Sequence, residues 1–491
     1  MKNLYKLFGI IAFVAIIAFT IAACGDEPDP DPYTPPPPEP GASASNPIDR
    51  IESVNLGTMT SQASGWRQLL NSINSTGKYI NLDLSACTMT GTSFNPDSSV
   101  ETGKKYIVSI ILPDVATSIE AETSSDPAFK NFTNLKSVSG ANIITIGDYS
   151  FRRETDGDYS YSYLQSADFP KATTIGTSAF SSTYLESINF PLVTTIGDSA
   201  FYGSRLKNAS FPAVQTIGKN AFSSCSDLES ISFPASAKLG YSSDDESYSN
   251  PFTGCMKLTS FTLSGSGSLS VIENDKALVR DSTILLAYPS ASGNITMNNI
   301  TALDGKAFQS CYYLDSVNFP QVTSIGSETF GSCSNIQDVS FPQVTSIGSR
   351  TFSDCSRLQS ASFPLVTTIG SYAFSRCTNL VSVNIPQVTS IGDSAFISTG
   401  DTALSITMGS TAPTLGGDIF WVTTTTTKTV TVKVPAGASG YSPFTGTTVT
   451  VSGTNTTVNW ANGFRGGGWN GSSFAQYSQP NQNITVIIQQ Q

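Results

Sequence analysis

The chain has 491 residues, and charged residues make up only 13% of it, well below the roughly 25% of an average globular protein. The net charge is −11, and no run of Lys or Arg follows the N-terminus, which argues against nucleic acid as a partner. The sequence contains no histidine, so it excludes Ser-His-Asp and Cys-His catalysis and lacks the commonest metal ligand.

The N-terminus has the pattern of an export signal. Lys2 and Lys6 precede an apolar run from Leu7 to Ala23, which ends in two alanines before Cys24. The pattern resembles a bacterial lipoprotein signal. The resemblance implies removal of residues 1–23, lipidation of Cys24, and anchoring to the cell envelope at the outer membrane or cell surface. An uncleaved membrane anchor is the alternative, although the apolar run is short for spanning a bilayer.

Residues 24–47 alternate proline with acidic residues, which favours an extended polyproline II tether. A proline-rich ligand for a partner domain is the alternative interpretation. We expect no electrostatic docking of this acidic chain on anionic lipid, so the membrane would be contacted through the lipid anchor only.

Residues 48–126 are expected to form an α/β N-terminal cap. An amphipathic helix is predicted from Ser64 to Ile73, with Trp66, Leu69 and Leu70 on the same face as Ile73. The alternation from Tyr79 to Leu84 predicts a strand.

The middle of the chain is repetitive, with phenylalanines and cysteines recurring at intervals of 21 or 22 residues. This predicted core ladder consists of Phe180, Phe201, Phe222, Phe308, Phe330, Phe352, Phe374, Phe396, Cys311, Cys333, Cys355 and Cys377. A single coil cannot bury its apolar edge, so stacked coils must share one core. The sequence therefore predicts a solenoid.

The copy from Leu358 to Cys377 shows the expected role of each position. Leu358, Ala361 and Phe363 should point inward from a short strand, which Pro364 ends. Ile369 should turn inward again, and Gly370 should permit a tight turn. Ser371–Cys377 is expected to be a short helical turn, with Phe374 and Cys377 on one face.

The pattern L-x-S-[VI]-x-F-P-x-V-T-x-I-G-x-x-A-F-x-x-C resembles the BspA-like, or Treponema pallidum type, leucine-rich repeat over residues 127–400. The resemblance implies a curved solenoid with a concave parallel β-sheet and irregular or helical turns outside. It also implies a surface antigen or adhesin that binds a host matrix protein, a host cell or another bacterium.

Several segments interrupt or follow the repeat. Thr155–Ser160 is an insertion, and a hairpin around Asp281–Ser282 is predicted within the insertion near 270–300. Such insertions either tune binding or are only tolerated. Residues 401–491 are expected to form an all-β C-terminal cap, with strands near 429–435, 447–451 and 484–488. The aromatic segment Trp460–Trp469 could seal the core or stack on sugars.

The ladder cysteines are expected to be free, buried thiols, with pairing between adjacent rungs as the alternative. No C-x-x-C pair occurs, so no metal site is predicted. The acidic stretches at 155–158 and 243–246 could bind calcium, but neither matches an established loop, and solvated loops are the favoured interpretation.

The outward strand positions carry small hydroxyl and amide side chains, which make a poor catalytic site but a possible hydrogen-bonding face. Single residues of this kind can equally be only solvated. The candidate binding face consists of Ser187, Asn189, Asn208, Ser210, Ser230, Ser232, Ser316, Asn318, Asp338, Ser340, Ser360, Ser362, Ser382 and Asn384.

The sequence thus favours a protein-binding adhesin over an enzyme, with no catalytic residues and no cofactor. A structural envelope protein that packs with itself or with other surface proteins is the second hypothesis. A carbohydrate-binding or carbohydrate-active solenoid is the third. A rigid repeated face would lose little ordering entropy on contact with a partner, which supports the first.

Overall fold

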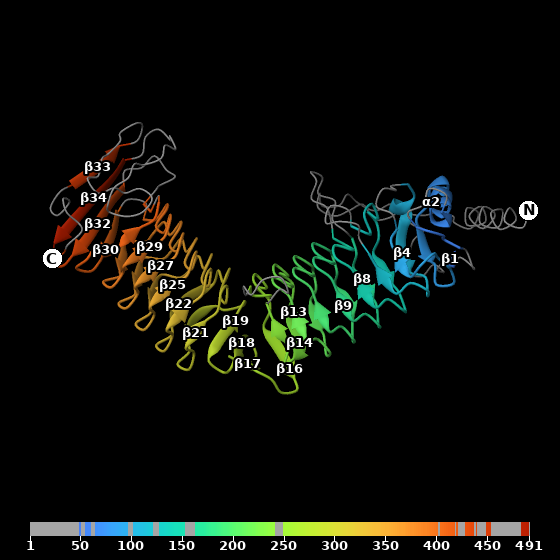
Figure 1. The fold of residues 1–491 in the computed structure, drawn as a ribbon, viewed down its shortest axis with the longest axis horizontal. Coiled ribbons are helices and arrows are strands. Elements are labelled where there is room, and N and C mark those ends of the chain that lie inside the picture. Colours follow the sequence, from blue (N-terminus) through green and yellow to red (C-terminus); the bar gives the residue numbers. More distant parts are fainter. Residues whose placement is uncertain are drawn as a thin grey trace, which may run out of the picture. The chain divides into compact units, whose positions relative to one another are not determined.

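The computed structural model describes residues 49–50, 55–59, 64–96, 102–120, 127–152, 163–240, 249–400, 403–417, 419–420, 428–436, 438, 448–452 and 483–490. The signal segment, Cys24, the tether, both acidic stretches and Trp460–Trp469 lie outside these residues. The chain forms two compact units, residues 1–251 with 264–266 and residues 252–263 with 267–491. Figure 1 shows the strands of the first unit in blue to green and those of the second in yellow-green to red.

Each regular coil contributes two strands, which stack on their counterparts in the neighbouring coils as two separate parallel ladders (Figure 1). We call the strand that carries the Leu-x-Ser pattern the long strand, and the Thr-Ile strand that follows it the short strand. The resemblance implied one parallel sheet, so the short-strand ladder is an addition to the expected architecture.

In the first unit, the long strands are β1 (Asp49–Arg50), β2 (Ile80–Asp83), β4 (Ile107–Ile111), β6 (Ser137–Ser139), β8 (Ser166–Asp168), β10 (Ser187–Asn189), β12 (Asn208–Ser210) and β14 (Ser230–Pro234). The short strands are β3 (Ser93–Phe94), β5 (Ser118–Ile119), β7 (Thr145–Ile146), β9 (Thr174–Ile175), β11 (Thr195–Ile196), β13 (Thr216–Ile217) and β15 (Lys238–Leu239). Both ladders run through residues 80–119, across the boundary expected at residue 126.

In the second unit, the long strands after β16 (Ser260–Ser264) are β20 (Gly293–Thr296), β22 (Leu314–Asn318), β24 (Asp338–Ser340), β26 (Ser360–Ser362), β28 (Ser382–Asn384), β30 (Ala403–Thr407), β32 (Lys428–Val434) and β34 (Asn483–Gln490). The short-strand ladder comprises β17 (Leu269–Ile272), β18 (Ala277–Arg280), β19 (Ile284–Ala287), β21 (Ala302–Leu303), β23 (Ser324–Ile325), β25 (Ser346–Ile347), β27 (Thr368–Ile369), β29 (Ser390–Ile391) and β31 (Thr414–Leu415).

The predicted hairpin around Asp281 and Ser282 is present, because β18 pairs antiparallel with β19. β17 adds a third antiparallel strand at the edge of this sheet. Near the C-terminus, β34 pairs parallel with β32 and antiparallel with β33 (Thr448–Ser452), so β33 rather than β34 is the last strand of that sheet.

The predicted helix is present as α2 (Gly65–Thr76), and a 3-10 turn, η1, follows at Lys104–Tyr106. Ser64 caps α2 by accepting a hydrogen bond from the backbone N–H of Arg67 at 3.2 Å, which satisfies one of the free donors of the first turn. The apolar face of α2 is buried, and the indole N–H of Trp66 donates to the carbonyl of Pro96 at 3.0 Å.

Stacked phenylalanines form the centre of each unit, and we call them the phenylalanine column. Ring centroids of Phe180 and Phe201 lie 5.4 Å apart in the first unit, and those of Phe330 and Phe352 lie 5.3 Å apart in the second. The paired rings are nearly parallel, and every ladder phenylalanine is fully buried. Stacking of this kind adds to the gain from apolar burial.

The segment Ser371–Cys377 is not a helical turn, contrary to the expectation from the sequence. Tyr372 and Arg376 have left-handed backbone conformations, with φ of 58° and 57°, and a right-handed helix cannot contain them. The N–H groups of Tyr372, Phe374 and Arg376 instead donate to carbonyls of the next coil at 2.8–2.9 Å. The segment is therefore a third inter-coil hydrogen-bond ladder.

Gly370 does not adopt a positive φ, so the tight-turn explanation was wrong as well. A Cβ atom at this position would lie 2.5 Å from the backbone nitrogen of Ser349 in the preceding coil. Glycine is required because two coils approach closely there.

Candidate functional site

Alternation along each long strand creates one polar face. Val317 in β22 and the central side chains of β24, β26 and β28 are buried, and the residues on either side of them point outward. Parallel in-register pairing then aligns equivalent residues of successive coils, as in Asp338 opposite Ser360 and Ser360 opposite Ser382. The outward residues therefore form columns along each unit, which we call the long-strand face.

The structure divides the candidate binding face between the two units. Six of the candidates, Ser187, Asn189, Asn208, Ser210, Ser230 and Ser232, come together in the first unit. The other eight, Ser316, Asn318, Asp338, Ser340, Ser360, Ser362, Ser382 and Asn384, come together in the second. All fourteen side chains are exposed or half-buried.

Many of these side chains bond to their neighbours one coil away. In the first unit, Ser230 donates to the amide oxygen of Asn208 at 2.5 Å, and Ser232 donates to Ser210 at 2.8 Å. In the second, the amide of Asn384 donates to Ser362 at 3.2 Å, and Ser360 donates to the Asp338 carboxylate. These bonds fix the rotamers and present a preformed surface.

The columns that flank this face were missed by the sequence reasoning. In the first unit, the position after the first leucine of each repeat carries Lys136, Gln165, Glu186, Lys207 and Glu229, a mostly charged column of mixed sign. In the second unit the same position carries Asp315, Gln337, Gln359 and Val381, all exposed. The signal was available when the repeats were aligned with one another, because this residue directly precedes the first outward strand residue of each copy.

The ladder cysteines lie in the core beneath this surface and are free. Cys333, Cys355 and Cys377 each donate an S–H hydrogen bond to the carbonyl of the phenylalanine 25 residues earlier, at 3.0–3.1 Å. Burial raises the pKa of Cys311 to about 12 and holds the pKa of Cys333 well above its usual value. The thiols therefore stay protonated and unreactive at neutral pH.

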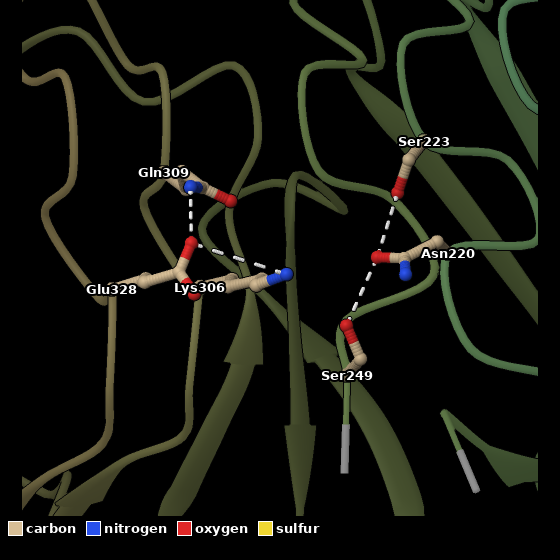
Figure 2. Close-up of polar contacts among 6 residues, drawn as sticks. All are labelled: Asn220, Ser223, Ser249, Lys306, Gln309 and Glu328. Atoms are coloured by element: carbon tan, nitrogen blue, oxygen red, sulfur yellow. Dashed lines mark hydrogen bonds and ion pairs between the residues drawn. The ribbon is translucent and has the colours of Figure 1, made fainter. Parts of the chain in front are cut away.

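The turns carry their own polar contacts, shown in Figure 2. In the first unit, Ser249 donates to the amide oxygen of Asn220 at 2.9 Å, and Ser223 does so at 3.4 Å. In the second, Glu328 accepts a hydrogen bond from Gln309 at 2.9 Å and lies 4.0 Å from the Lys306 ammonium. The contacts of Ser249 and Glu328 join successive coils, whereas Ser223 bonds within its own coil, and none of these contacts forms a reactive group.

Within the described residues, no group of three or more acidic, cysteine or histidine side chains is placed to hold a metal ion. The same part of the chain contains no helix with the length and apolarity needed to cross a bilayer. The geometry thus offers repeated hydrogen-bonding columns as its main chemical feature.

Comparison with known proteins agrees with this architecture. The BspA type leucine rich repeat region matches in six copies, over residues 155–276 and 295–427. A search of curated proteins gives no match.

Solved structures with a similar fold come from several bacteria. A leucine rich cell surface protein from Faecalibacterium prausnitzii is 23% identical, with a TM-score of 0.46, over 68% of this chain and 84% of that one. A leucine-rich repeat protein from Eubacterium ventriosum is 23% identical, with a TM-score of 0.46, over 65% and 78%. The pneumococcal vaccine antigen PcpA is 18% identical, with a TM-score of 0.43, over 79% and 80%. The repeat profile covers more than half of the sequence, and the chain belongs to the BspA type leucine-rich repeat family.

Proposed function

We propose that this protein is a bacterial surface lipoprotein, anchored through Cys24, that attaches the cell to a protein ligand through the long-strand face of its first unit. The observation that supports this most is the preformed face of the first unit. Its hydroxyl and amide columns are fixed by bonds between coils, and a column of mixed charge borders them. A rigid surface loses little conformational entropy when it binds.

The mixed charge favours a protein ligand for the first unit. Lys207 and Glu229 are exposed on adjacent coils, so the border can complement a surface that carries both signs. A binding role also fits the neutral hydroxyl and amide side chains better than catalysis does. The polar tether would hold the repeat away from the membrane.

The test is binding of the purified chain to immobilised fibronectin, fibrinogen and other matrix proteins. We expect the double variant Asn208→Arg with Ser210→Arg to lower affinity at least tenfold, because bulky cations would cover two columns of the face. The matched control is Gln215→Arg, an exposed residue next to the short-strand ladder of the same unit. Equal affinity of all three proteins would contradict the proposal.

Exposure on the cell is tested separately. Protease shaving of intact cells should release solenoid peptides, and Cys24→Ser should move the protein into the medium or the soluble fraction. Full protection from protease would contradict the attachment role. Self-association without any matrix binding would instead favour a structural envelope protein.

A further inference from the structure

The long-strand face of the second unit differs from that of the first in its chemistry. Two columns of small polar residues form its centre. The first consists of Asn294, Ser316, Asp338, Ser360, Ser382 and Ser405. The second consists of Thr296, Asn318, Ser340, Ser362, Asn384 and Thr407. The position after the proline that follows each strand carries the exposed residues Gln321, Gln343, Leu365 and Gln387. The position before the outward residues carries Asp315, Gln337, Gln359 and Val381.

These columns carry few charges. Lys433 of β32, which pairs with Thr407 and is half-buried, extends one column with a cation, and the carboxylates are few. Asp338 lies within the face and accepts a hydrogen bond from Ser360, while Asp315 lies at its border and accepts one from Asn335. A polyanion gains little from such a face, and a polycation meets little charge. Charge complementarity therefore selects an uncharged ligand.

The hydrogen-bonding pattern suits vicinal hydroxyl groups. Ser316 donates to the amide oxygen of Asn294 at 2.7 Å, which commits that hydroxyl hydrogen and leaves serine lone pairs and amide N–H groups for a ligand. Amide side chains can donate and accept at the same time, as hydroxyl groups on a sugar ring require.

The face lacks what a protein ligand needs. Among the described residues of this face, exposed large aliphatic side chains occur only in the bordering columns, at Leu365 and Val381. Tight protein interfaces depend on aromatic or arginine anchors near their centre. The centre of this face has only small hydroxyls, amides and one carboxylate.

Exposed aromatic rings lie at one border. Tyr313 is 73% exposed and Tyr312 is 42% exposed, and both directly precede β22. An aromatic ring in this position can pack against the apolar face of a pyranose, which an amide strip cannot do.

The spacing of the columns matches a polymer. Equivalent residues of successive coils are about 4.8 Å apart in a parallel ladder, and the sugar units of an extended β-linked chain repeat at nearly this distance. We propose that the long-strand face of the second unit binds a neutral, β-linked polysaccharide that lies along the coils. This goes beyond attachment to a protein through the first unit, and either can fail alone.

The experiment measures binding of the full chain to soluble mixed-linkage β-glucan and to xylan, with hyaluronan and heparin as charged probes. Affinity for a neutral glycan should be the same at 50 and 500 mM salt within about twofold, since no charges attract it. Gln343→Ala with Gln359→Ala, and Tyr313→Ala, should each raise Kd about tenfold, because each removes one or two ligand contacts.

Gln215→Ala in the first unit is the matched control and should leave glycan binding unchanged. The first-unit variant Asn208→Arg with Ser210→Arg should weaken protein binding only. A far-ultraviolet circular dichroism melt of each variant shows whether it remains folded. Absence of binding to both neutral glycans, salt-sensitive binding of hyaluronan or heparin instead, or Kd values unaffected by the face variants would overturn the proposal.

Discussion

The Phe180 and Phe201 coils of the first unit are one residue shorter than the regular coils of the second, in the turn between the phenylalanine column and the long strand. The Phe222 coil of the first unit has the longer form, and its Cys225 donates to the carbonyl of Phe201 at 3.0 Å. Five positions separate Phe180 from Leu185 in the first unit, and six separate Phe330 from Ile336 in the second. In the shorter coil, Thr183 donates to the carbonyl of Phe180 in its own coil at 2.9 Å. In the longer coil, Cys355 donates to the carbonyl of Phe330 in the preceding coil at 3.1 Å.

This difference teaches how one inserted residue changes the polar bonds of a solenoid. The phenylalanine rings stack at 5.4 Å in one unit and 5.3 Å in the other, so the apolar core tolerates both lengths. The buried carbonyl must be satisfied in either case, because an unpaired one costs about 1–3 kcal/mol. In the shorter coil the side-chain donor lies in the same coil as the carbonyl. In the longer coil the Phe330 carbonyl accepts from the backbone N–H of Cys333 in its own coil and from the Cys355 thiol of the next coil, so the second bond links two coils.

Alkaline pH should produce the largest difference in stability between the two units. Burial raises the pKa of Cys311, Cys333, Cys355 and Cys377 in the second unit, and of Cys225 in the first. A raised pKa in the folded state means that stability is complete below the unfolded pKa near 9 and is lost as pH rises toward the folded value. At pH 10 each thiol should cost roughly 1.4 kcal/mol, so these four thiols together cost the second unit about 6 kcal/mol.

Hydrogen exchange followed by mass spectrometry reads the two units separately at pH 8 and pH 10. A variant with threonine at the four second-unit positions should keep its stability at pH 10. Equal losses in the two units, or the same loss in the threonine variant, would show that the thiols do not control alkaline stability.

Substitution of a glycine at which two coils approach closely should give the next largest loss of stability. The loss should be similar in both units. A Cβ on Gly370 would lie 2.5 Å from the Ser349 nitrogen, and one on Gly197 would lie 2.6 Å from the Gly176 carbonyl carbon. We expect Gly370→Ala and Gly197→Ala each to lower the free energy of unfolding by about 3 kcal/mol, because backbone must move to remove the overlap. Urea unfolding measures the loss.

Gly417→Ala is the control for this prediction. A Cβ at Gly417 would meet only the Asp393 carboxylate at 3.9 Å, so its cost should stay below about 1 kcal/mol. If Gly370→Ala were as mild as Gly417→Ala, the coils would be less tightly apposed than the structure shows.

Removal of one thiol should have a smaller effect that depends on the hydrogen bond. Cys355→Val leaves the buried carbonyl of Phe330 with only the backbone N–H of Cys333, at 3.1 Å, as its donor. We therefore expect a loss of about 0.5–1.5 kcal/mol. Cys355→Thr should retain most stability, since Thr399 makes the equivalent bond to the Phe374 carbonyl at 2.8 Å in the last regular coil. Thermal unfolding compares the two variants.

The same substitution in the first unit sharpens the comparison. Thr183→Val should cost a similar amount, but the loss of exchange protection should stay within its own coil. With Cys355→Val, protection should fall in both coils that the bond joins. Identical patterns of exchange protection for the two variants would mean that the bond between coils does not couple the stability of one coil to that of the next.

The sequence was sufficient to predict the features that have a strong period. Trp66, Leu69 and Ile73 repeat at helical spacing, and α2 buries them as predicted. The alternation of Leu358, Ala361 and Phe363 predicted β26 and its inward residues for the same reason. Apolar periodicity therefore located the core and one ladder.

The missed features have no such period. A two-residue strand such as Thr368–Ile369 is too short to show alternation, so the short-strand ladder was not predicted. Tyr372 and Arg376 give no sign of a left-handed backbone, because that conformation is imposed by bonds to the next coil. The charged and amide columns beside the candidate face were visible only once pairing had aligned the copies.

Substitutions at turn residues with a left-handed backbone should have the smallest effect on stability. The two units carry different residues at one such position, so each residue can be replaced by its counterpart from the other unit. Ser332 in the second unit and Gly203 in the first occupy the same place in the turn, with φ of 61° and 66°. Both donate a backbone hydrogen bond to the next coil, at 2.7 and 2.9 Å, so a substitution leaves that bond in place. Ser332→Gly should raise the free energy of unfolding by up to about 1 kcal/mol, and Gly203→Ser should lower it by a similar amount. A Cβ at Gly203 meets nothing closer than 3.8 Å, so backbone strain is the main cause of either change. Urea unfolding of the two variants measures both effects, and changes of the same sign would show that side-chain contacts, rather than the left-handed backbone, decide which residue the turn prefers.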